Sequence, residues 1–321
     1  MKRAANLLEQ IVERRNLQLA AYRALRGKRD RPDARMFVAD LERNLRQMAE
    51  QVWAGEFPVG RCTQFTIHDP KKRTITAPCF AERVLHHAIM NICEPLLERF
   101  LIDDTYACRR GKGRIAALHR AVHFSARFPA FLKLDVRKYF DSVSHLVLCQ
   151  RLERRFKDER LLALLWQILD VYHTSPGRGL PIGSLTSQHL ANFYLGWFDR
   201  FVKEVIRSPG YVRYMDDCVL WGATSAELRQ SLARTKLNPR PSRAGSQRRT
   251  LGTAVFVGDS LAELPMSGLR CYAFGVSGQI FESPSPRKMP TCAKDGIRTW
   301  PPARKSQDLA SRGLASRASS R

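Results

Sequence analysis

The chain has 321 residues, of which 44% are hydrophobic, so it can bury a sizeable core in two or three domains or in one multi-lobed enzyme. Its formal net charge of +24 predicts a polyanionic partner. Nucleic acid is favoured over an anionic membrane surface, because there is no apolar run of roughly 18 residues or more and no N-terminal signal pattern. The 8 cysteines form no Cys-x-x-Cys pair, which argues against a zinc site and a disulfide framework and predicts free thiols in a reducing cytoplasm.

The N-terminal part of the chain, residues 1–59, has apolar residues at helical spacing. This spacing predicts amphipathic helices over residues 5–25 and 34–54, joined by a basic linker at residues 26–32. Taken alone, the linker is most simply a solvated loop. Two short β-like runs with a basic turn between them follow in residues 65–76.

A helix is predicted from about Phe80 to Phe100. His86 and His87 lie on it without a third His or Cys at metal-binding spacing, so we expect them to pack or to form hydrogen bonds rather than to bind a metal.

A basic, glycine-containing stretch at residues 106–114 comes directly before a helical pattern that starts near Ile115. Glycines let a backbone approach phosphates closely, and arginines donate forked hydrogen bonds to phosphate oxygens. The stretch is a weak signal alone. In a strongly basic chain with acidic sites further on, it is a candidate phosphate-binding loop.

Two acidic sites follow apolar runs. Residues 131–135 predict a strand that ends in Asp135, and residues 211–220 predict a β-hairpin with Asp216 and Asp217 at its tight turn. An ordinary acidic turn is the alternative for the hairpin alone, since Asp is common in turns. A strand end beside this hairpin can gather three carboxylates at one sheet edge, where hard oxygen ligands bind Mg²⁺. Two such ions stabilise the attacking and leaving oxygens of a phosphoryl transfer, so the pattern predicts polymerase-like chemistry.

Between the two acidic sites lies a Gly-rich segment at residues 179–184. Helices are predicted over residues 160–172 and 186–206, the second with Ser184 and Thr186 as capping residues. From about residue 237 the character of the chain changes to Ser, Arg, Pro and Gly, with short apolar runs such as residues 254–257.

The C-terminal segment also has few acids, because only five of the 30 acidic residues lie between residues 231 and 321. A basic tail that holds RNA is one interpretation. A truncated or frame-shifted sequence is another, and isolated Cys, Trp and Pro without periodicity favour it. The final twenty residues are predicted to be disordered.

Tyr-Met-Asp-Asp at residues 214–217 resembles the catalytic box of reverse transcriptases. Residues 134–140 resemble the first palm motif of that family, and residues 180–188 with 191–195 resemble the motif between the acids. Arg73 with Pro78, and residues 106–113, resemble the two fingers motifs. The resemblance runs from about residue 60 to residue 222, in the family's order and at plausible spacing.

The resemblance implies a right-hand polymerase fold of the α/β (α+β) class, with an antiparallel palm sheet packed on helices and an incomplete or irregular thumb. The implied domains are a helical N-terminal extension (1–59), fingers (60–130), a palm with the catalytic carboxylates (131–236) and an irregular basic C-terminal segment (237–321).

The resemblance also implies roles for single residues. Asp135 and Asp216 would bridge two Mg²⁺ ions, with Mn²⁺ as an alternative, and the Val136 carbonyl and Asp217 would assist. The implied nucleotide pocket consists of Arg73, Arg109, Lys112, Phe140, Ile182, Gly183 and Gln188. The three cations would contact the triphosphate, and Phe140 would exclude a 2′-hydroxyl. Core packing is the alternative for Phe140.

One difference from the usual family sequence narrows the choice among types of reverse transcriptase. Retroviral and group II intron enzymes usually carry Gln-Gly near residues 181–183 and Ser-Pro where this chain has Ser187 and Gln188. The Ile-Gly-x-x-x-Ser-Gln pattern, with residues 83–88, is similar to reverse transcriptases of diversity-generating retroelements, bacterial and phage enzymes that introduce errors at template adenines. Ile182 has no donor or acceptor, so we expect it to contribute to mutagenic copying. A tolerated apolar contact is the alternative.

The implied partners are a template RNA, a primer or cDNA, dNTPs and a small basic accessory protein, in a bacterial or phage-encoded cytoplasmic system without a membrane. Two alternatives stay open. One is a group II intron-like or retron-like reverse transcriptase, and the other is a catalytically inactive, thumb-less RNA-binding remnant.

Overall fold

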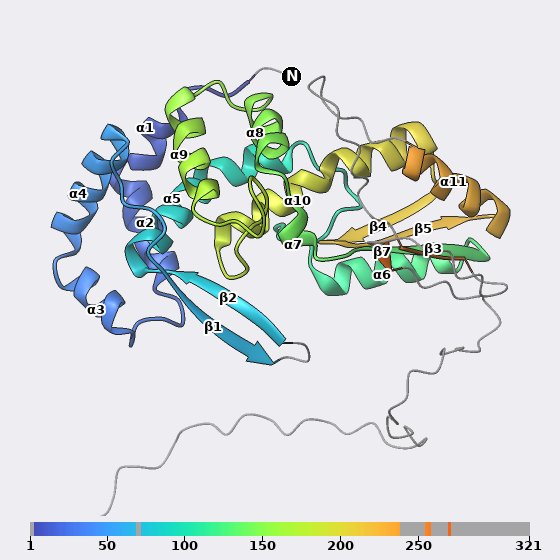
Figure 1. Ribbon diagram of the computed structural model, residues 1–321, viewed down its shortest axis with the longest axis horizontal. Helices are drawn as coiled ribbons and strands as arrows, with labels where there is room; N and C mark the ends of the chain where they lie inside the picture. The colour runs from blue at the N-terminus through green and yellow to red at the C-terminus, as the bar shows by residue number, and fades with distance from the viewer. Residues whose placement is uncertain (1–2, 69–71, 238–253, 258–268, 271–321) are drawn as a thin grey trace, which may run out of the picture. The chain divides into compact units, whose positions relative to one another are not determined.

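A computed structural model describes residues 3–68, 72–237, 254–257 and 269–270 of the chain (Figure 1). All of these described residues belong to one compact unit, Met1–Ile280. The basic turn at residues 69–71 and most of the C-terminal segment, including its final twenty residues, lie outside them. The predictions of a disordered end and of an irregular thumb therefore fall outside the described part of the chain.

Four helices, rather than the two predicted, form the N-terminal part: α1 (Leu7–Val12), α2 (Arg14–Ala24), α3 (Pro32–Ala39) and α4 (Leu41–Ala54). Each predicted helix is interrupted where one residue leaves the helical conformation, at Glu13 (φ −56°, ψ 133°) and at Asp40 (φ −131°, ψ 56°). The side-chain amide of Asn16 compensates for the first break, because it donates to Ile11 O at 2.9 Å and to Ala88 O at 3.1 Å. The break thus lets α1 and α2 both pack on α5, the next helix.

The predicted pair of β runs forms a two-stranded antiparallel sheet of β1 (Cys62–His68) and β2 (Lys72–Pro78), with Phe65 opposite Ile75. Two helices follow, α5 (Phe80–Glu98) and α6 (Arg114–Ser125), as the apolar periodicity predicts. Helix α5 is buried along most of its length, and α1, α2, α3 and α10 all pack against it.

A second, five-stranded antiparallel sheet has the strand order β4-β5-β3-β6, with β7 also paired to β3. Its strands are β3 (Ala130–Val136), β4 (Gly210–Tyr214), β5 (Asp217–Gly222), β6 (Ala254–Val257) and β7 (Leu269–Arg270). The predicted strand and hairpin are confirmed, and the short apolar run at residues 254–257 adds a strand beside β3.

Both faces of this sheet are covered by helices, because successive side chains of a strand point to opposite faces. On one face, Leu132, Leu134 and Leu220 pack with the π-helix η1 (Phe201–Ile206) and with α11 (Ser225–Leu237). On the other, Val212 and Trp221 pack against α6. Figure 1 shows α6 on one side of the strands and α11 on the other.

The remaining helices are α7 (Tyr139–Ser142), α8 (His145–Glu153), α9 (Glu159–Asp170), α10 (Leu185–Arg200), the π-helix η1 (Phe201–Ile206) and α11 (Ser225–Leu237). The helix predicted over residues 186–206 is therefore α10 continued by η1. Ser184 occupies the N-cap position of α10, but its side chain forms no capping hydrogen bond. Its hydroxyl instead lies 3.2 Å from His86 Nδ1 and 2.8 Å from Thr186 Oγ1. The predicted capping position of Ser184 is therefore confirmed without the capping hydrogen bond, and Thr186, which lies inside the helix, is not a cap.

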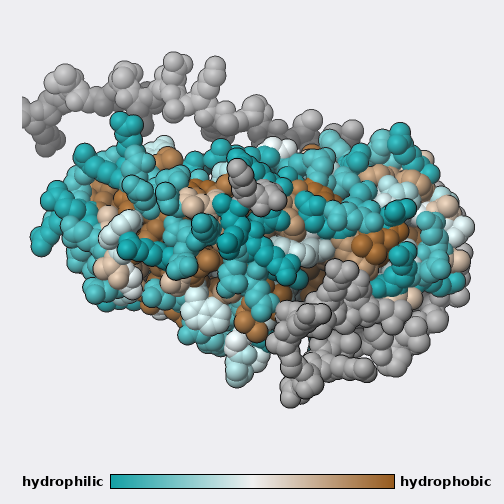
Figure 2. Space-filling view, turned by 90° about the horizontal axis from the view of Figure 1, so that it is seen from above, coloured by the Kyte–Doolittle hydropathy of each residue, from teal (hydrophilic) through white to brown (hydrophobic). Residues whose placement is uncertain are grey.

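The predicted class of mixed helices and antiparallel sheets is confirmed. Figure 2 shows one face of the molecule, on which hydrophilic side chains predominate and hydrophobic ones form small separate patches. Across the described ranges, no helix combines the length and the apolar character that crossing a membrane requires.

Candidate active site

Three acidic residues, Asp135, Asp216 and Asp217, lie at one end of the five-stranded sheet. Leu134 of β3 lies opposite Cys218 of β5, so Asp135 and Asp217 occupy the next pair of positions along these strands. The side-chain alternation places both acids on the face opposite to Leu134 and Cys218, which are buried. Asp217 also forms an ion pair with Lys133, with 3.0 Å between Nζ and Oδ1.

Asp216 lies in the turn between β4 and β5, directly after Met215, which has a left-handed backbone with φ 56°. Burial raises the pKa of Asp216 to about 6, and the negative charges of Asp135 and Asp217 add to this effect. The three predicted acids are thus close enough to repel one another. Carboxylate oxygens are hard donors of the kind that Mg²⁺ and Mn²⁺ prefer, and a cation between these acids would relieve their repulsion.

A buried ion pair between Arg213 and Asp199 stabilises the turn that carries Asp216. Arg213 of β4 and Asp199 of α10 are both fully buried, and Arg213 Nε and Nη2 donate to Asp199 Oδ1 and Oδ2, each at 2.7 Å. Asp199 also accepts from Tyr211 Oη at 2.7 Å and from Thr105 Oγ1 at 3.0 Å. Burial alone would lower the pKa of Arg213, but the charge and hydrogen bonds of Asp199 raise it above its ordinary value.

The same guanidinium fixes the backbone next to Asp216. Arg213 Nη1 donates to Met215 O at 2.7 Å and to Asn192 Oδ1 at 2.8 Å. The Asn192 side chain in turn donates to Ala107 O at 2.8 Å, which ties α10 to the basic loop. Arg213 and Asn192 were not among the predicted site residues. An arginine at an inward position of a predicted strand is nevertheless a recognisable signal, because arginines are rarely buried without a partner.

Two cations predicted to contact the triphosphate have protein partners. Arg109 Nη1 donates to Ile102 O at 2.7 Å and to Thr105 O at 2.8 Å. Lys112 Nζ pairs with Asp103 Oδ1 at 2.6 Å and also donates to Asp103 O. A phosphate contact by either side chain would need these bonds to be exchanged, because the structure uses both cations to hold the basic loop together.

Other cations are exposed near the predicted pocket. Arg110 and Arg114 of the basic loop, and Arg73 of β2, are exposed and have no side-chain partner within the described part of the chain. Arg73 stands opposite Ile67 in the β1–β2 hairpin. Arg110 and Arg114 belong to the predicted phosphate-binding loop but were not among the residues predicted to contact the triphosphate, whereas Arg73 was.

The loop before α10 is attached to the β1–β2 hairpin. Thr76 N donates to Ile182 O at 2.7 Å. Gly183 has a left-handed backbone with φ 117°, and a Cβ there would lie 2.7 Å from Ile75 Cγ2 and 3.0 Å from Thr76 O. Only glycine fits at this position without strain. Gln188, in the first turns of α10, is exposed and lies 4.0 Å from the sulfur of Cys108 in the basic loop.

Phe140 lies on α7, close to the same loop. Its carbonyl accepts a hydrogen bond from Leu180 N at 2.8 Å, and its half-buried ring packs edge-on against Tyr139 with 5.8 Å between centroids. The ring also contacts the main hydrophobic core. The ring is only half-buried, so core packing and a role toward the sugar are compatible.

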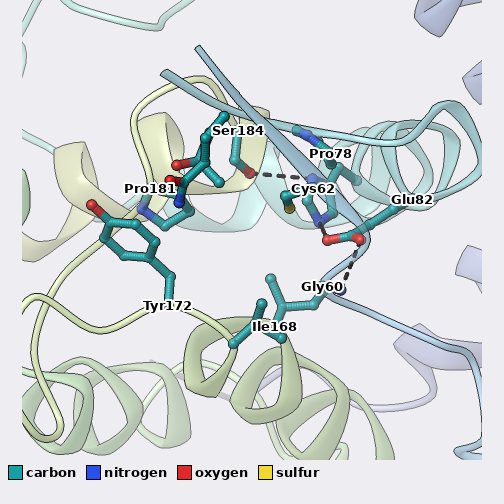
Figure 3. A pocket seen from close by; sticks show the side chains of 12 residues that line it. Gly60, Cys62, Pro78, Glu82, Ile168, Tyr172, Pro181 and Ser184 are labelled. Carbon is teal, nitrogen blue, oxygen red and sulfur yellow. Dashed lines mark hydrogen bonds and ion pairs between the residues drawn. The ribbon is translucent and has the colours of Figure 1, made fainter. Parts of the chain in front are cut away.

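A pocket opens behind the loop of residues 181–184, between α9 and the base of the β1–β2 hairpin (Figure 3). Ser184, His86 and Glu82 form a chain in its wall, with 3.2 Å from Ser184 Oγ to His86 Nδ1 and 3.6 Å from His86 Nε2 to Glu82 Oε1. Glu82 accepts from Gly60 N at 2.8 Å. Burial raises the pKa of Glu82 and lowers that of His86 to about 3. His86 is thus a neutral, hydrogen-bonded side chain, as the sequence predicted.

The sequence profile of the reverse transcriptase (RNA-dependent DNA polymerase) family matches residues 67–238. This is more than half of the 321 residues, and the chain therefore belongs to this family. Its fold is the right-hand polymerase fold, as the sequence predicted.

Several known proteins are similar to parts of the chain. Protein YkfC of Escherichia coli (strain K12) is 26% identical over 149 residues, which cover 42% of this chain and 38% of that protein. The group II intron-encoded protein LtrA of Lactococcus lactis subsp. cremoris is 25% identical over 155 residues, which cover 46% of this chain and 26% of LtrA. The chain thus matches well under half of the length of either relative.

Two solved structures also resemble the chain. A chain of a partial Cas6-RT-Cas1–Cas2 complex matches with a TM-score of 0.40 and 21% identity, covering 72% of this chain and 42% of that chain. Apo telomerase from Candida tropicalis matches with a TM-score of 0.43 and 10% identity, covering 65% of this chain and 52% of that chain. The family assignment rests on the sequence profile.

Proposed function

We propose that the chain is an RNA-directed DNA polymerase that extends a primer along an RNA template. The observation that carries the proposal is the convergence of Asp135, Asp216 and Asp217 at one sheet edge, in a chain of this family. The net charge of +24 supports a nucleic-acid substrate, because phosphates dominate the affinity of such complexes.

In this proposal, Asp135 and Asp216 hold two divalent cations, Mg²⁺ or Mn²⁺, with the Val136 carbonyl and Asp217 as further ligands. When bound, the ions stabilise the charge on the attacking and leaving oxygens of nucleotidyl transfer. Such transfer depends mainly on positioning. Arg213 supplies this rigidity, because it fixes the Met215 carbonyl beside Asp216 in a turn that is otherwise strained.

The remaining predicted residues belong to a proposed nucleotide pocket between fingers (60–130) and palm (131–236). Exposed Arg73 is the best placed of the predicted cations for the triphosphate, and Arg109 and Lys112 would need to exchange partners. Gly183 and Gln188 would line the base side. Segment 237–321 would follow the palm where relatives of this type carry a thumb.

Primer extension on an RNA template with Mg²⁺ and dNTPs tests the proposal. The parent chain is expected to extend the primer by itself, and a small basic protein encoded beside it should increase the yield if the retroelement assignment is correct. If the chain binds RNA but does not extend the primer, with or without the small basic protein, the assignment as a polymerase is contradicted. That result would support a thumb-less RNA-binding remnant.

Replacing Phe140 with Ala is expected to admit ribonucleotides, since the ring would no longer block a 2′-hydroxyl. Single-nucleotide incorporation with a dNTP and with the matching rNTP measures the change in sugar selectivity. Phe128→Ala, which removes another half-buried ring that packs near Trp221, serves as the matched control. Equal selectivity in both variants and the parent would leave Phe140 as a core residue.

We further propose that copying is error-prone, as in diversity-generating retroelements, and that Ile182 contributes to it. Ile182→Gln introduces a donor and an acceptor near the incoming nucleotide, and one such hydrogen bond changes discrimination by on the order of 1 kcal/mol, or several-fold. Sequencing of the cDNA should show fewer errors at template adenines than the parent and the Ile182→Val control produce. An unchanged error spectrum would remove Ile182 from the proposal.

The similarity to LtrA supports the second candidate, a group II intron-like enzyme. The Ile182 and Gln188 pattern favours the retroelement type. Two of the relatives are bacterial, which is consistent with a bacterial or phage-encoded cytoplasmic enzyme.

A further inference from the structure

A cluster of two histidines and one aspartate lies on elements that carry none of the three proposed catalytic acids. His145 is the first residue of α8, Asp170 is the last residue of α9, and His173 lies in the loop after α9. Each offers a ligand atom, and these atoms all lie within 4.8 Å of one another. We propose that His145, Asp170 and His173 bind one divalent transition-metal ion, with Zn²⁺ as the best fit.

His145 shows why the cluster points to a ligand. Its side chain is 1% exposed, and its Nε2 lies 2.6 Å from Gly179 O, so Nε2 carries the proton and donates to that carbonyl. This tautomer leaves the lone pair of Nδ1 unused, and Nδ1 is buried without a hydrogen-bond partner in the described part of the chain. Metal-binding histidines usually donate their second nitrogen to a carbonyl in this way, which orients the ring and fixes the tautomer.

The other two ligands are accessible. The side chains of His173 and Asp170 are 37% and 59% exposed, and His173 Nε2 lies 3.4 Å from Asp170 Oδ1. His173 Nε2 also donates to Asp170 O at 2.7 Å, so a metal would bind Nδ1 of His173 or replace this hydrogen bond at Nε2. The His145 and His173 rings have centroids 5.1 Å apart. The site is therefore closed on the side of His145 and open to solvent on the other. An ion can enter from there, and water can fill the remaining coordination position.

The donor set decides the class of ion. Two imidazoles and one carboxylate suit Zn²⁺, Co²⁺ or Ni²⁺, whereas Mg²⁺ prefers oxygen ligands alone. Zinc takes nitrogen and oxygen ligands at about 2.0–2.2 Å, so the three ligand atoms must approach one another slightly. Asp170 and His173 are exposed and can make this movement.

An ion at this position would brace the segment that leads into the proposed nucleotide pocket. His145 N donates to Gly177 O at 2.9 Å, and Gly179 N donates to Val143 O at 2.9 Å. The next residue, Leu180, donates to Phe140 O. Residues 173–180 are thus already attached to α7 and α8 by their backbone, and a metal would add a link to α9.

Metal titration of the full chain tests the proposal. The chain is freed of affinity tags and of bound metals, and it carries Asp216→Asn so that the acidic sheet edge contributes less binding. We expect one equivalent of Zn²⁺ by calorimetry, a visible absorption band when Co²⁺ binds, and a higher unfolding temperature with Zn²⁺.

His173→Gln and Asp170→Asn, both at exposed positions, should each lower the affinity at least about 10-fold and abolish the Co²⁺ band. His119→Gln, an exposed histidine on α6, is the matched control and should bind as the parent does. The proposal is overturned if the parent does not bind Zn²⁺, if the two variants bind it unchanged, or if the control loses as much affinity as they do.

Discussion

Asp216→Ala is expected to lower nucleotide incorporation by about 1,000-fold or more, while RNA binding and folding stay nearly intact. Removal of a group that stabilises charge in the transition state has effects of this size or larger. Folding should not suffer, because burial and the repulsion from Asp135 and Asp217 raise the pKa of Asp216 and make its charged form unfavourable in the folded chain. The variant should therefore unfold at the parent's temperature or above it.

Three measurements on the same preparation separate these effects: primer extension, RNA binding and thermal unfolding. Glu50→Ala, which removes an exposed acid on α4, is the control and should behave as the parent in all three. Primer extension at the parent's rate by Asp216→Ala would contradict the assignment of the acidic edge as the catalytic centre. Lost activity with lost folding would show that Asp216 is needed for structure instead.

Arg213→Met is expected to lower the free energy of unfolding by about 3–5 kcal/mol, because it leaves the carboxylate of Asp199 buried without its counter-ion. Asp199 is fully buried, and Tyr211 and Thr105 alone would remain to satisfy it. Replacing both partners, Arg213→Met with Asp199→Leu, removes both charges and should restore most of the lost stability.

Chemical denaturation measures these differences, and Arg14→Ala serves as the control. The Arg14–Glu42 pair is also an arginine–carboxylate contact, at 2.9 Å, but its side chains are 73% and 48% exposed, so its loss should change the free energy of unfolding very little. The double variant should also remain slow in primer extension, because Met215 O has lost its donor. Full activity in the double variant would show that the turn holds its shape without Arg213.

The strands, the hairpin and the acids could be predicted from the sequence because their signals are local. Apolar alternation predicts β3 and the β4–β5 hairpin, and it also predicts the face on which Asp135 and Asp217 lie. The interruptions at Glu13 and Asp40 could not be predicted, since the apolar period runs through both positions without change. The breaks also change which side chains are buried, because Leu19, Tyr22 and Met36, which belong to the apolar period, are exposed in the structure.

The long-range partners of the predicted side chains could not be predicted from the sequence, for a different reason. Composition identified a basic loop, but it could not show that Asp103 captures Lys112 or that two carbonyls hold Arg109. In the same way, His145 and His173 stand 28 positions apart on separate elements, so no spacing rule brings them together. Such contacts depend on how helices dock, and only the folded chain reveals them.

The connection between Thr76 and Ile182 has a mechanical consequence. Their backbone hydrogen bond of 2.7 Å, and the lack of room for any side chain at Gly183, clamp the loop before α10 to the root of the β1–β2 hairpin. If the hairpin tilts like a lever when a nucleotide arrives, the loop has to travel with it. Substrate arrival would then move the β1–β2 hairpin and the loop before α10 together.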